Sequence, residues 1–166
     1  MQQFKKVKPT PRSKAGTFVE AVPVKRFKPG EDRSLALLGL KSSNLLTLQK
    51  DIEQGFPVTV LRHIQHHYAF SRMELADALR VSARTLDRRE ALGRLDPLES
   101  DRALRLSRVY AKAVELYEGN EKAALAWLKR KNRALGNVPP VDLIKTEIGA
   151  LQVEHLIGRL EYGVYS

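Results

Sequence analysis

The sequence of 166 residues contains no cysteine, which excludes disulfide bonds and any metal site built on thiolates. No apolar run approaches the roughly 20 residues needed to span a bilayer, so we expect no transmembrane helix and no membrane partner. The first residues also lack the apolar segment of a secretory signal. These absences favour a cytoplasmic location.

Signals of catalysis are missing as well. The sequence has no phosphate-binding loop, no nucleophile elbow and no recognisable pair of catalytic carboxylates. His63 and His67 are one helical turn apart and could start a zinc site, but neither His66 nor His155 supplies an evident third ligand. We therefore expect no enzyme, no metal site and no cofactor.

No stretch alternates apolar and polar residues over the length of a strand, and the apolar residues recur at helical spacing instead. The fold class expected is all-α. Either Ser43 or Asn44 is suited to cap one helix, and Ser71 and Ser82 are suited to cap two others. Pro57 is suited to a first helical turn. The helices expected after residue 30 cover 33–40, 44–54, 57–68, 71–79, 82–90 and 96–118, followed by a C-terminal group.

Positive charge is abundant and uneven. The chain has 29 basic and 19 acidic residues, a formal charge of +10, and residues 1–30 contain eight Lys or Arg against Glu20 alone. Such an excess favours an anionic partner, usually nucleic acid. With four prolines, residues 1–30 are predicted to be a basic, disordered arm. The arm either only solubilises the protein or adds phosphate contacts that do not depend on DNA sequence.

The segment Ser71–Glu90 has the spacing of a helix-turn-helix. Leu75, Ala76 and Leu79 form one face of a first helix, and the second helix buries Leu86. The residues predicted to bind DNA are Arg80, Ser82, Arg84, Thr85, Arg88 and Arg89. Arginine suits this role because its guanidinium makes bidentate contacts with guanine and phosphate.

Two positions depart from a simple DNA-reading helix. Arg80 occupies the turn position that usually holds glycine, so either the turn differs or Arg80 adopts a left-handed conformation. Asp87 would repel phosphate unless it pairs, with Arg84 or Arg88 the expected partner. The alternatives are two packed helices with solvated arginines, or a scaffold or dimer surface that has lost DNA binding.

The last third of the chain combines a helix ending at a Gly136–Asn137 turn, a short helix at Val141–Thr146, a break at Gly149 and a last amphipathic helix. Gly149 allows either a sharp turn or a close approach of the backbone. With the upstream helix-turn-helix, this part resembles the Xre/MbcA/ParS antitoxins. Asn137 departs from the family pattern, in which a second glycine is expected after Gly136, but asparagine tolerates left-handed dihedrals. The resemblance rests on Trp127, Leu128, Asn132, Ala134–Gly136, Pro140, Leu143, Thr146, Gly149, Val153, Leu156 and Leu160–Gly163.

The resemblance covers about residues 60–166 and implies a Cro/repressor-like part joined to a toxin-binding domain. We expect the helical DNA-binding domain to span residues 31–118 and a small helical toxin-binding domain with a tail to span 119–166. The resemblance further implies a type II antitoxin that occludes the active site of a RES-domain toxin acting on NAD, and that represses its own promoter as a homodimer. The residues it assigns to toxin binding are Leu156, Arg159, Leu160, Glu161, Tyr162, Gly163, Val164, Tyr165 and Ser166.

Three other interpretations stay open. The chain could be a stand-alone helix-turn-helix regulator whose C-terminal part dimerises or senses a ligand, or a scaffold without specific DNA binding. Trp127 and the apolar stripe of the last helix could simply form core, and Tyr162–Ser166 a frayed end. A neighbouring gene for a toxin would separate the antitoxin from the regulator.

Overall fold

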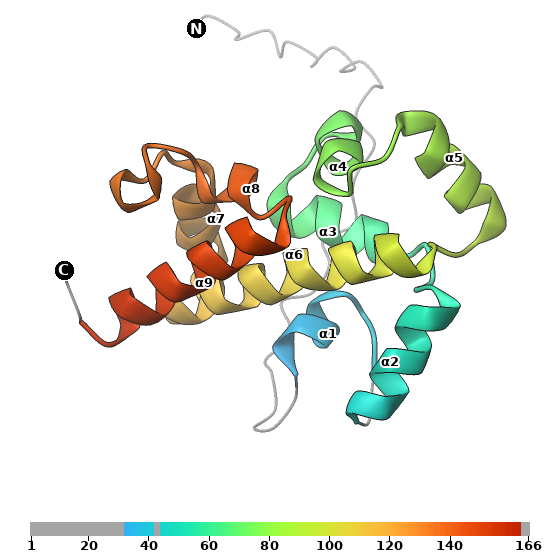
Figure 1. Ribbon diagram of the computed structural model, residues 1–166, viewed down its shortest axis with the longest axis horizontal. Coiled ribbons are helices and arrows are strands. Elements are labelled where there is room, and N and C mark those ends of the chain that lie inside the picture. Colours follow the sequence, from blue (N-terminus) through green and yellow to red (C-terminus); the bar gives the residue numbers. More distant parts are fainter. Residues whose placement is uncertain (1–31, 42–43, 164–166) are drawn as a thin grey trace, which may run out of the picture.

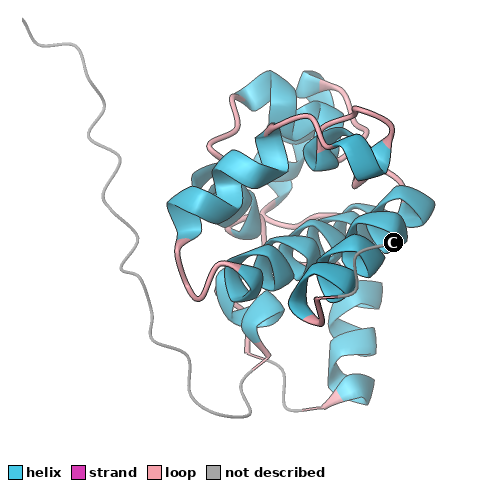
Figure 2. Cartoon of the chain, turned by 90° about the vertical axis from the view of Figure 1, so that its left-hand side faces the viewer, coloured by secondary structure: helices cyan, strands magenta, loops and turns pink. Residues whose placement is uncertain are grey.

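The computed structural model describes residues 32–41 and 44–163, and within these ranges the chain is helical. Figures 1 and 2 show helices and loops with no strand in the described part, where pairing of extended backbone is limited to two isolated bridges. The all-α fold is confirmed. The elements are α1 (Arg33–Leu37), α2 (Leu45–Gln54), α3 (Val60–Tyr68), α4 (Arg72–Ala78), α5 (Ala83–Leu92), α6 (Pro97–Leu116), α7 (Glu121–Lys129), the 3-10 helix η1 (Arg133–Leu135), α8 (Pro140–Leu143) and α9 (Glu147–Glu161).

Helix α6 is the centre of the molecule. Its 20 residues make it about 30 Å long, and it packs against α1, α2, α3, α7 and α9. Leu106 and Val109 on α6 are buried, and the hydroxyl of Tyr68 on α3 donates to the Leu106 carbonyl at 2.8 Å. One continuous apolar core therefore joins the helix-turn-helix region to the C-terminal helices. The division into domains at residue 118 stays a prediction.

The expected helix starts are confirmed where a side chain caps the backbone. The side chains of Asn44, Ser71 and Ser82 accept hydrogen bonds from the backbone N–H three residues on. Ser71 and Glu74 form a capping box, as do Asp96 and Glu99 at the start of α6. These contacts satisfy N–H groups that have no partner inside their own helix.

Some expected boundaries were wrong. The short helix expected at Val141–Thr146 is α8, which ends at Leu143, and Thr146 instead caps α9. Helix α3 begins at Val60 rather than at Pro57, because Pro57 pairs with Arg94 in an isolated bridge. Gly149 does not break the chain but lies within the first turn of α9. Its backbone lies so close to α8 that an added Cβ would be 2.0 Å from the Leu143 carbonyl oxygen. Close approach, not a turn, is the reason for glycine at this position.

Helix α9 lies along α6 (Figure 1). Its apolar face is buried, and Glu147 and Glu154 pair with cations of α6. Val153, Leu156 and Ile157 enter the core, and burial of each side chain contributes about 1.5–3 kcal/mol. Glu154 pairs with Arg108 at 2.6 Å and with Lys112 at 2.7 Å. These contacts fix α9 so that its opposite face is turned to solvent.

Candidate functional site

Helices α4 and α5 form the helix-turn-helix that the sequence predicts. Leu75, Leu79 and Leu86 are buried between them and the rest of the core. The exposed side of α5 carries Arg84 and Arg88, one turn apart. A helix placed in this way can offer its side chains to the major groove.

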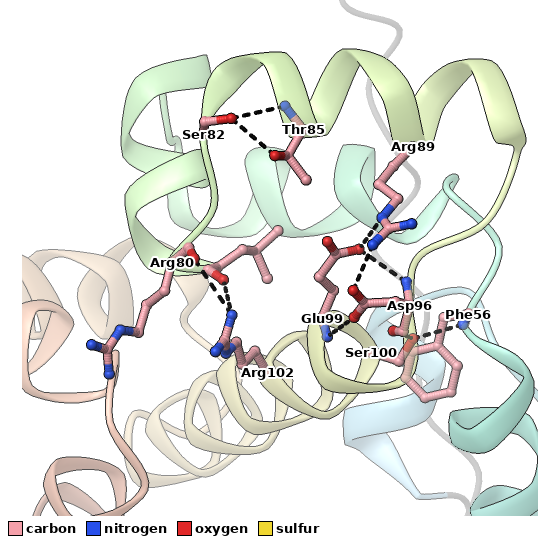
Figure 3. Close-up of polar contacts among 10 residues, drawn as sticks. Phe56, Arg80, Ser82, Thr85, Arg89, Asp96, Glu99, Ser100 and Arg102 are labelled. Carbon is pink, nitrogen blue, oxygen red and sulfur yellow. Dashed lines mark hydrogen bonds and ion pairs between the residues drawn. The ribbon is translucent and has the colours of Figure 1, made fainter.

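The turn between α4 and α5 is built around a left-handed arginine. Arg80 has φ +53°, so the second of the two conformations considered for it is the correct one. The N–H of Arg80 donates to the Asp77 carbonyl and that of Val81 to the Ala76 carbonyl, both at 2.9 Å, which closes the end of α4. The guanidinium of Arg102 on α6 adds a hydrogen bond to the Leu79 carbonyl at 2.9 Å (Figure 3).

Internal pairing leaves two free cations on α5. Asp87, expected to pair with Arg84 or Arg88, instead pairs with Arg72 of α4, which also holds Glu90 at 2.9 Å. That expectation was wrong because the first turn of α4 brings a third arginine to the acidic side of α5. Within the described part of the chain, the guanidinium groups of Arg84 and Arg88 have neither a hydrogen bond nor an ion pair.

Arg89, predicted to bind DNA, is turned into the protein. Its Nε donates to Glu99 Oε2 at 2.7 Å and its Nη2 to Asp96 Oδ2 at 2.5 Å (Figure 3). The Arg89 side chain is 15% exposed and that of Glu99 4%. The hydrogen bond with Glu99 is the main reason that the pKa of Arg89 is raised. In this structure Arg89 is committed to holding α5 against α6.

The two hydroxyl residues of the predicted DNA site lie at the start of α5. Ser82 Oγ accepts from the Thr85 N–H at 3.0 Å and shares a hydrogen bond with Thr85 Oγ1 at 2.9 Å (Figure 3). Ser82 is exposed and Thr85 half-buried. Both hydroxyls are occupied in capping α5, so Arg80, Arg84 and Arg88 are the side chains of this set with free polar atoms.

The structure separates the residues predicted to bind a toxin into two groups. Leu156 is 5% exposed and belongs to the core, and Leu160 packs partly against it. Arg159, Glu161, Tyr162 and Gly163 are exposed, Tyr162 to 84%. Val164, Tyr165 and Ser166 lie outside the described residues.

The exposed side of α9 starts nearer to the beginning of the helix than the toxin-binding residues predicted from the sequence. It carries Ile148, Leu151, His155, Arg159 and Tyr162, three or four residues apart, which we call the outer face of α9. The helical spacing of these residues is present in the sequence, beside the more apolar stripe that the core buries. An open groove of about 960 Å³ adjoins this face, lined by Ala134, Leu135, Gly136, Gln152, Glu154, His155, Gly158, Arg159 and Tyr162.

The turn that forms the other wall of the groove is left-handed at both Gly136 and Asn137, with φ of +70° and +62°. Asparagine therefore fills the position where a second glycine was expected, as predicted. The Asn132 side chain caps the 3-10 helix η1 ahead of this turn, and Pro140 begins α8. The conformation of this groove wall is therefore set by residues that lie close together in the sequence.

The described residues contain neither a metal-binding cluster nor a membrane-spanning helix. No group of three or more metal-ligating side chains occurs among the described residues. None of the helices in the described ranges is both long and apolar enough to cross a membrane. His67, one of the zinc candidates, instead contacts the Leu37 carbonyl through Nε2 at 3.1 Å.

Comparison with known proteins identifies both regions. Residues 47–108 match the model of the antitoxin Xre-like helix-turn-helix domain, and residues 112–163 match that of the antitoxin Xre/MbcA/ParS C-terminal toxin-binding domain. A protein of Yersinia enterocolitica named antitoxin Xre is 38% identical over 130 residues, 78% of this chain and 88% of the relative. A protein of Photorhabdus laumondii with the same name is 36% identical over the same shares.

Proposed function

The chain belongs to the antitoxin Xre family, and from this premise we propose that it neutralises a RES-domain toxin that consumes NAD, by occluding the toxin's active site. Membership makes the chain a type II antitoxin with a helix-turn-helix domain and a toxin-binding domain, and not an enzyme. The RES toxin, its NAD substrate and the mode of inhibition belong to the proposal.

The observation that carries the proposal is the outer face of α9 with the groove beside it. The rest of α9 is engaged with α6, so this face is the part of the helix available to a partner. Tyr162 and Glu161 stand exposed at its end. A toxin cleft that binds NAD accepts a flat ring and anionic phosphates. The aromatic ring of Tyr162 and the carboxylate of Glu161 offer these two features, and the toxin cannot cleave them.

We further propose that the chain represses its own promoter as a homodimer. Arg84 and Arg88 would contact guanine or phosphate in the major groove, and Arg80 would add a contact with the DNA phosphate backbone. Two copies would place their α5 helices in successive major grooves about 34 Å apart. The support is the pair of unpaired guanidinium groups on the exposed side of α5.

The test is a pull-down of the tagged full chain from its native cells, with mass spectrometry of the protein that co-purifies. The released partner should consume NAD, and adding the chain back should stop this. A variant with Arg159→Ala and Tyr162→Ala should bind the partner more weakly, by about tenfold or more if these side chains lie at the centre of the interface. Its DNA binding should stay unchanged.

The matched control is Leu45→Ala, which removes an equally exposed apolar side chain from α2. Loss of inhibition in the α9 variant alone would support the proposed face. Equal inhibition by the α9 variant and the wild type would rule that face out. A partner that leaves NAD intact would remove the RES assignment, and recovery of DNA without a protein partner would favour a stand-alone regulator.

A further inference from the structure

Helix α5 is attached to α6 at both of its ends by arginine side chains (Figure 3). At one end Arg89, on α5 itself, reaches the first turn of α6. At the other end Arg102, on α6, reaches the turn that leads into α5. Leu86 is buried between these two attachments. A helix fixed at two points and packed in the middle has little freedom to tilt or rotate.

The attachment through Arg89 uses two carboxylates, of which Glu99 is buried and Asp96 is 38% exposed. Asp96 and Glu99 are already tied together, because the Asp96 N–H donates to Glu99 Oε2 at 2.9 Å and the Glu99 N–H to Asp96 Oδ1 at 2.8 Å. Arg89 then bonds to one oxygen of each carboxylate. A charged pair this well ordered has a defined geometry, and geometry rather than net stability is the property best attested for such pairs.

The attachment through Arg102 acts on the backbone. Its Nη1 donates to the Leu79 carbonyl at 2.9 Å and reaches the Arg80 carbonyl at 3.5 Å. These carbonyls flank the left-handed residue that sets the angle between α4 and α5. Glu99 and Arg102 are three residues apart and thus share one face of α6, so one helix face controls both ends of α5.

We propose that Arg89 and Arg102 are positioning residues of the DNA-reading surface. They fix the angle at which α5 presents Arg84 and Arg88, and neither contacts DNA. The inference rests on the proposed reading of DNA by α5. It replaces the contact role that the sequence predicts for Arg89 and assigns a role to Arg102, which the sequence does not single out.

The experiment begins with selection of duplexes from a random library by the full-length wild-type chain. The dissociation constants for the enriched duplex and for a scrambled duplex are then measured over a range of salt concentrations. The variants are Arg102→Gln, Arg102→Lys, the double change Arg89→Met with Glu99→Met, and Arg88→Ala. The double change removes Arg89 together with Glu99, its buried partner. It leaves the Asp96 carboxylate, which is 38% exposed and still accepts from the backbone N–H of residue 99.

Arg102→Gln and the double variant should lower the preference for the enriched duplex by about tenfold, the scale of one lost base contact. Their salt slope should equal that of the wild type, because no phosphate contact is lost. Arg88→Ala should instead flatten the slope by about 0.9 if Arg88 neutralises one phosphate. Arg102→Lys should keep most of the preference that Arg102→Gln loses, since an ammonium can donate to the same carbonyls.

The matched control is Arg108→Gln, which breaks an ion pair on the same helix far from α5 and should keep the preference. An unchanged preference in both Arg102→Gln and the double variant would overturn the inference, and so would a flattened salt slope in either. If the double variant fails to fold, the Gln and Lys changes at Arg102 decide alone. A wild-type chain that enriches no duplex would remove the proposed DNA reading and this inference together.

Discussion

His67 is held in its neutral form by its surroundings. Burial lowers the pKa of His67 to about 4, a change that the hydrogen bond to Leu37 only partly opposes and that nearby His66 and His63 reinforce. Since Nε2 donates to the Leu37 carbonyl, Nδ1 must be the unprotonated nitrogen, and it is buried without a hydrogen-bond partner. A proton added there would be a buried charge next to the Tyr110 ring.

This arrangement predicts a loss of stability in mild acid. The unfolded chain binds a proton at His67 near pH 6.5, whereas the folded chain does so only near pH 4, so stability is complete above 6.5 and falls as the pH drops towards 4. The free energy of unfolding should decrease by about 2 kcal/mol between pH 7 and pH 5. Urea denaturation at the two pH values measures it.

The control for this prediction is His67→Gln, whose amide can still donate to the Leu37 carbonyl but does not titrate. Its free energy of unfolding should change much less over the same range. Part of the loss should persist, because burial also lowers the pKa of His63. An unaltered pH dependence in His67→Gln would show that His67 is not responsible.

Among the elements, the turn between α4 and α5 holds Arg80, a residue proposed to contact DNA, in an unfavourable backbone conformation. Arg80 is left-handed, which costs about 1–2 kcal/mol for a residue with a Cβ atom. Arg80→Gly should therefore raise the free energy of unfolding by about 0.5–1 kcal/mol, after the greater entropy of glycine in the unfolded chain is counted. The same change should weaken DNA binding, because a guanidinium next to α5 is lost.

Chemical denaturation and a DNA titration together test these opposite effects. Arg80→Ala is the matched control, since it removes the guanidinium but keeps the Cβ atom. It should weaken DNA binding as much as Arg80→Gly does and bring no gain in stability. Stronger or equal DNA binding by both variants would contradict a contact role for Arg80.

Elements that depend on neighbouring residues could be predicted from the sequence, and those that depend on distant ones could not. The caps at Asn44, Ser71 and Ser82 involve side chains within three residues of the groups they bond. The starts of α3 and α9 were misplaced because Pro57 pairs with Arg94 and Gly149 meets the backbone of Leu143. Proline and glycine are each compatible with several local structures, and only the tertiary fold decides which of these structures forms.

The same limit applied to the candidate site. The arginine-rich sequence of α5 predicts a DNA-reading helix, and its position in the helix-turn-helix is confirmed. Which arginines are free could not be read from the sequence, because Arg72 lies 15 residues before Asp87 and Glu99 lies 10 after Arg89. Charges on one helix can be paired by residues of the next, and spacing along the chain does not reveal this.

At the scale of the whole molecule, positive charge is concentrated at the N-terminal end of the sequence. Residues 1–30 contribute +7 of the formal +10, from eight basic residues and one acidic residue, so residues 31–166 carry +3. Among the described residues, Arg72 and Arg89 beside α5 and Arg105 and Arg108 beside α9 are engaged in ion pairs. The unpaired cations of α5 alone therefore give a modest attraction for DNA.

Removal of residues 1–30 should weaken DNA binding for all sequences alike. Counterion release makes the affinity fall with salt by a slope of about 0.9 per neutralised phosphate, and the arm could neutralise several. The truncated chain should bind both an enriched and a scrambled duplex less tightly at low salt, with a flatter salt dependence and an unchanged ratio between the two. Binding titrations across a range of salt concentrations measure all three quantities.

A full-length chain in which Lys5, Lys6 and Lys8 are changed to Gln separates charge from length. It should reproduce part of the effect, since three of the eight cations are lost. Because the arm supplies no base contact in this account, partner binding and sequence preference should remain those of the wild type. A truncated chain that loses preference for the enriched duplex, while its salt slope stays the same, would instead give the arm a role in reading sequence.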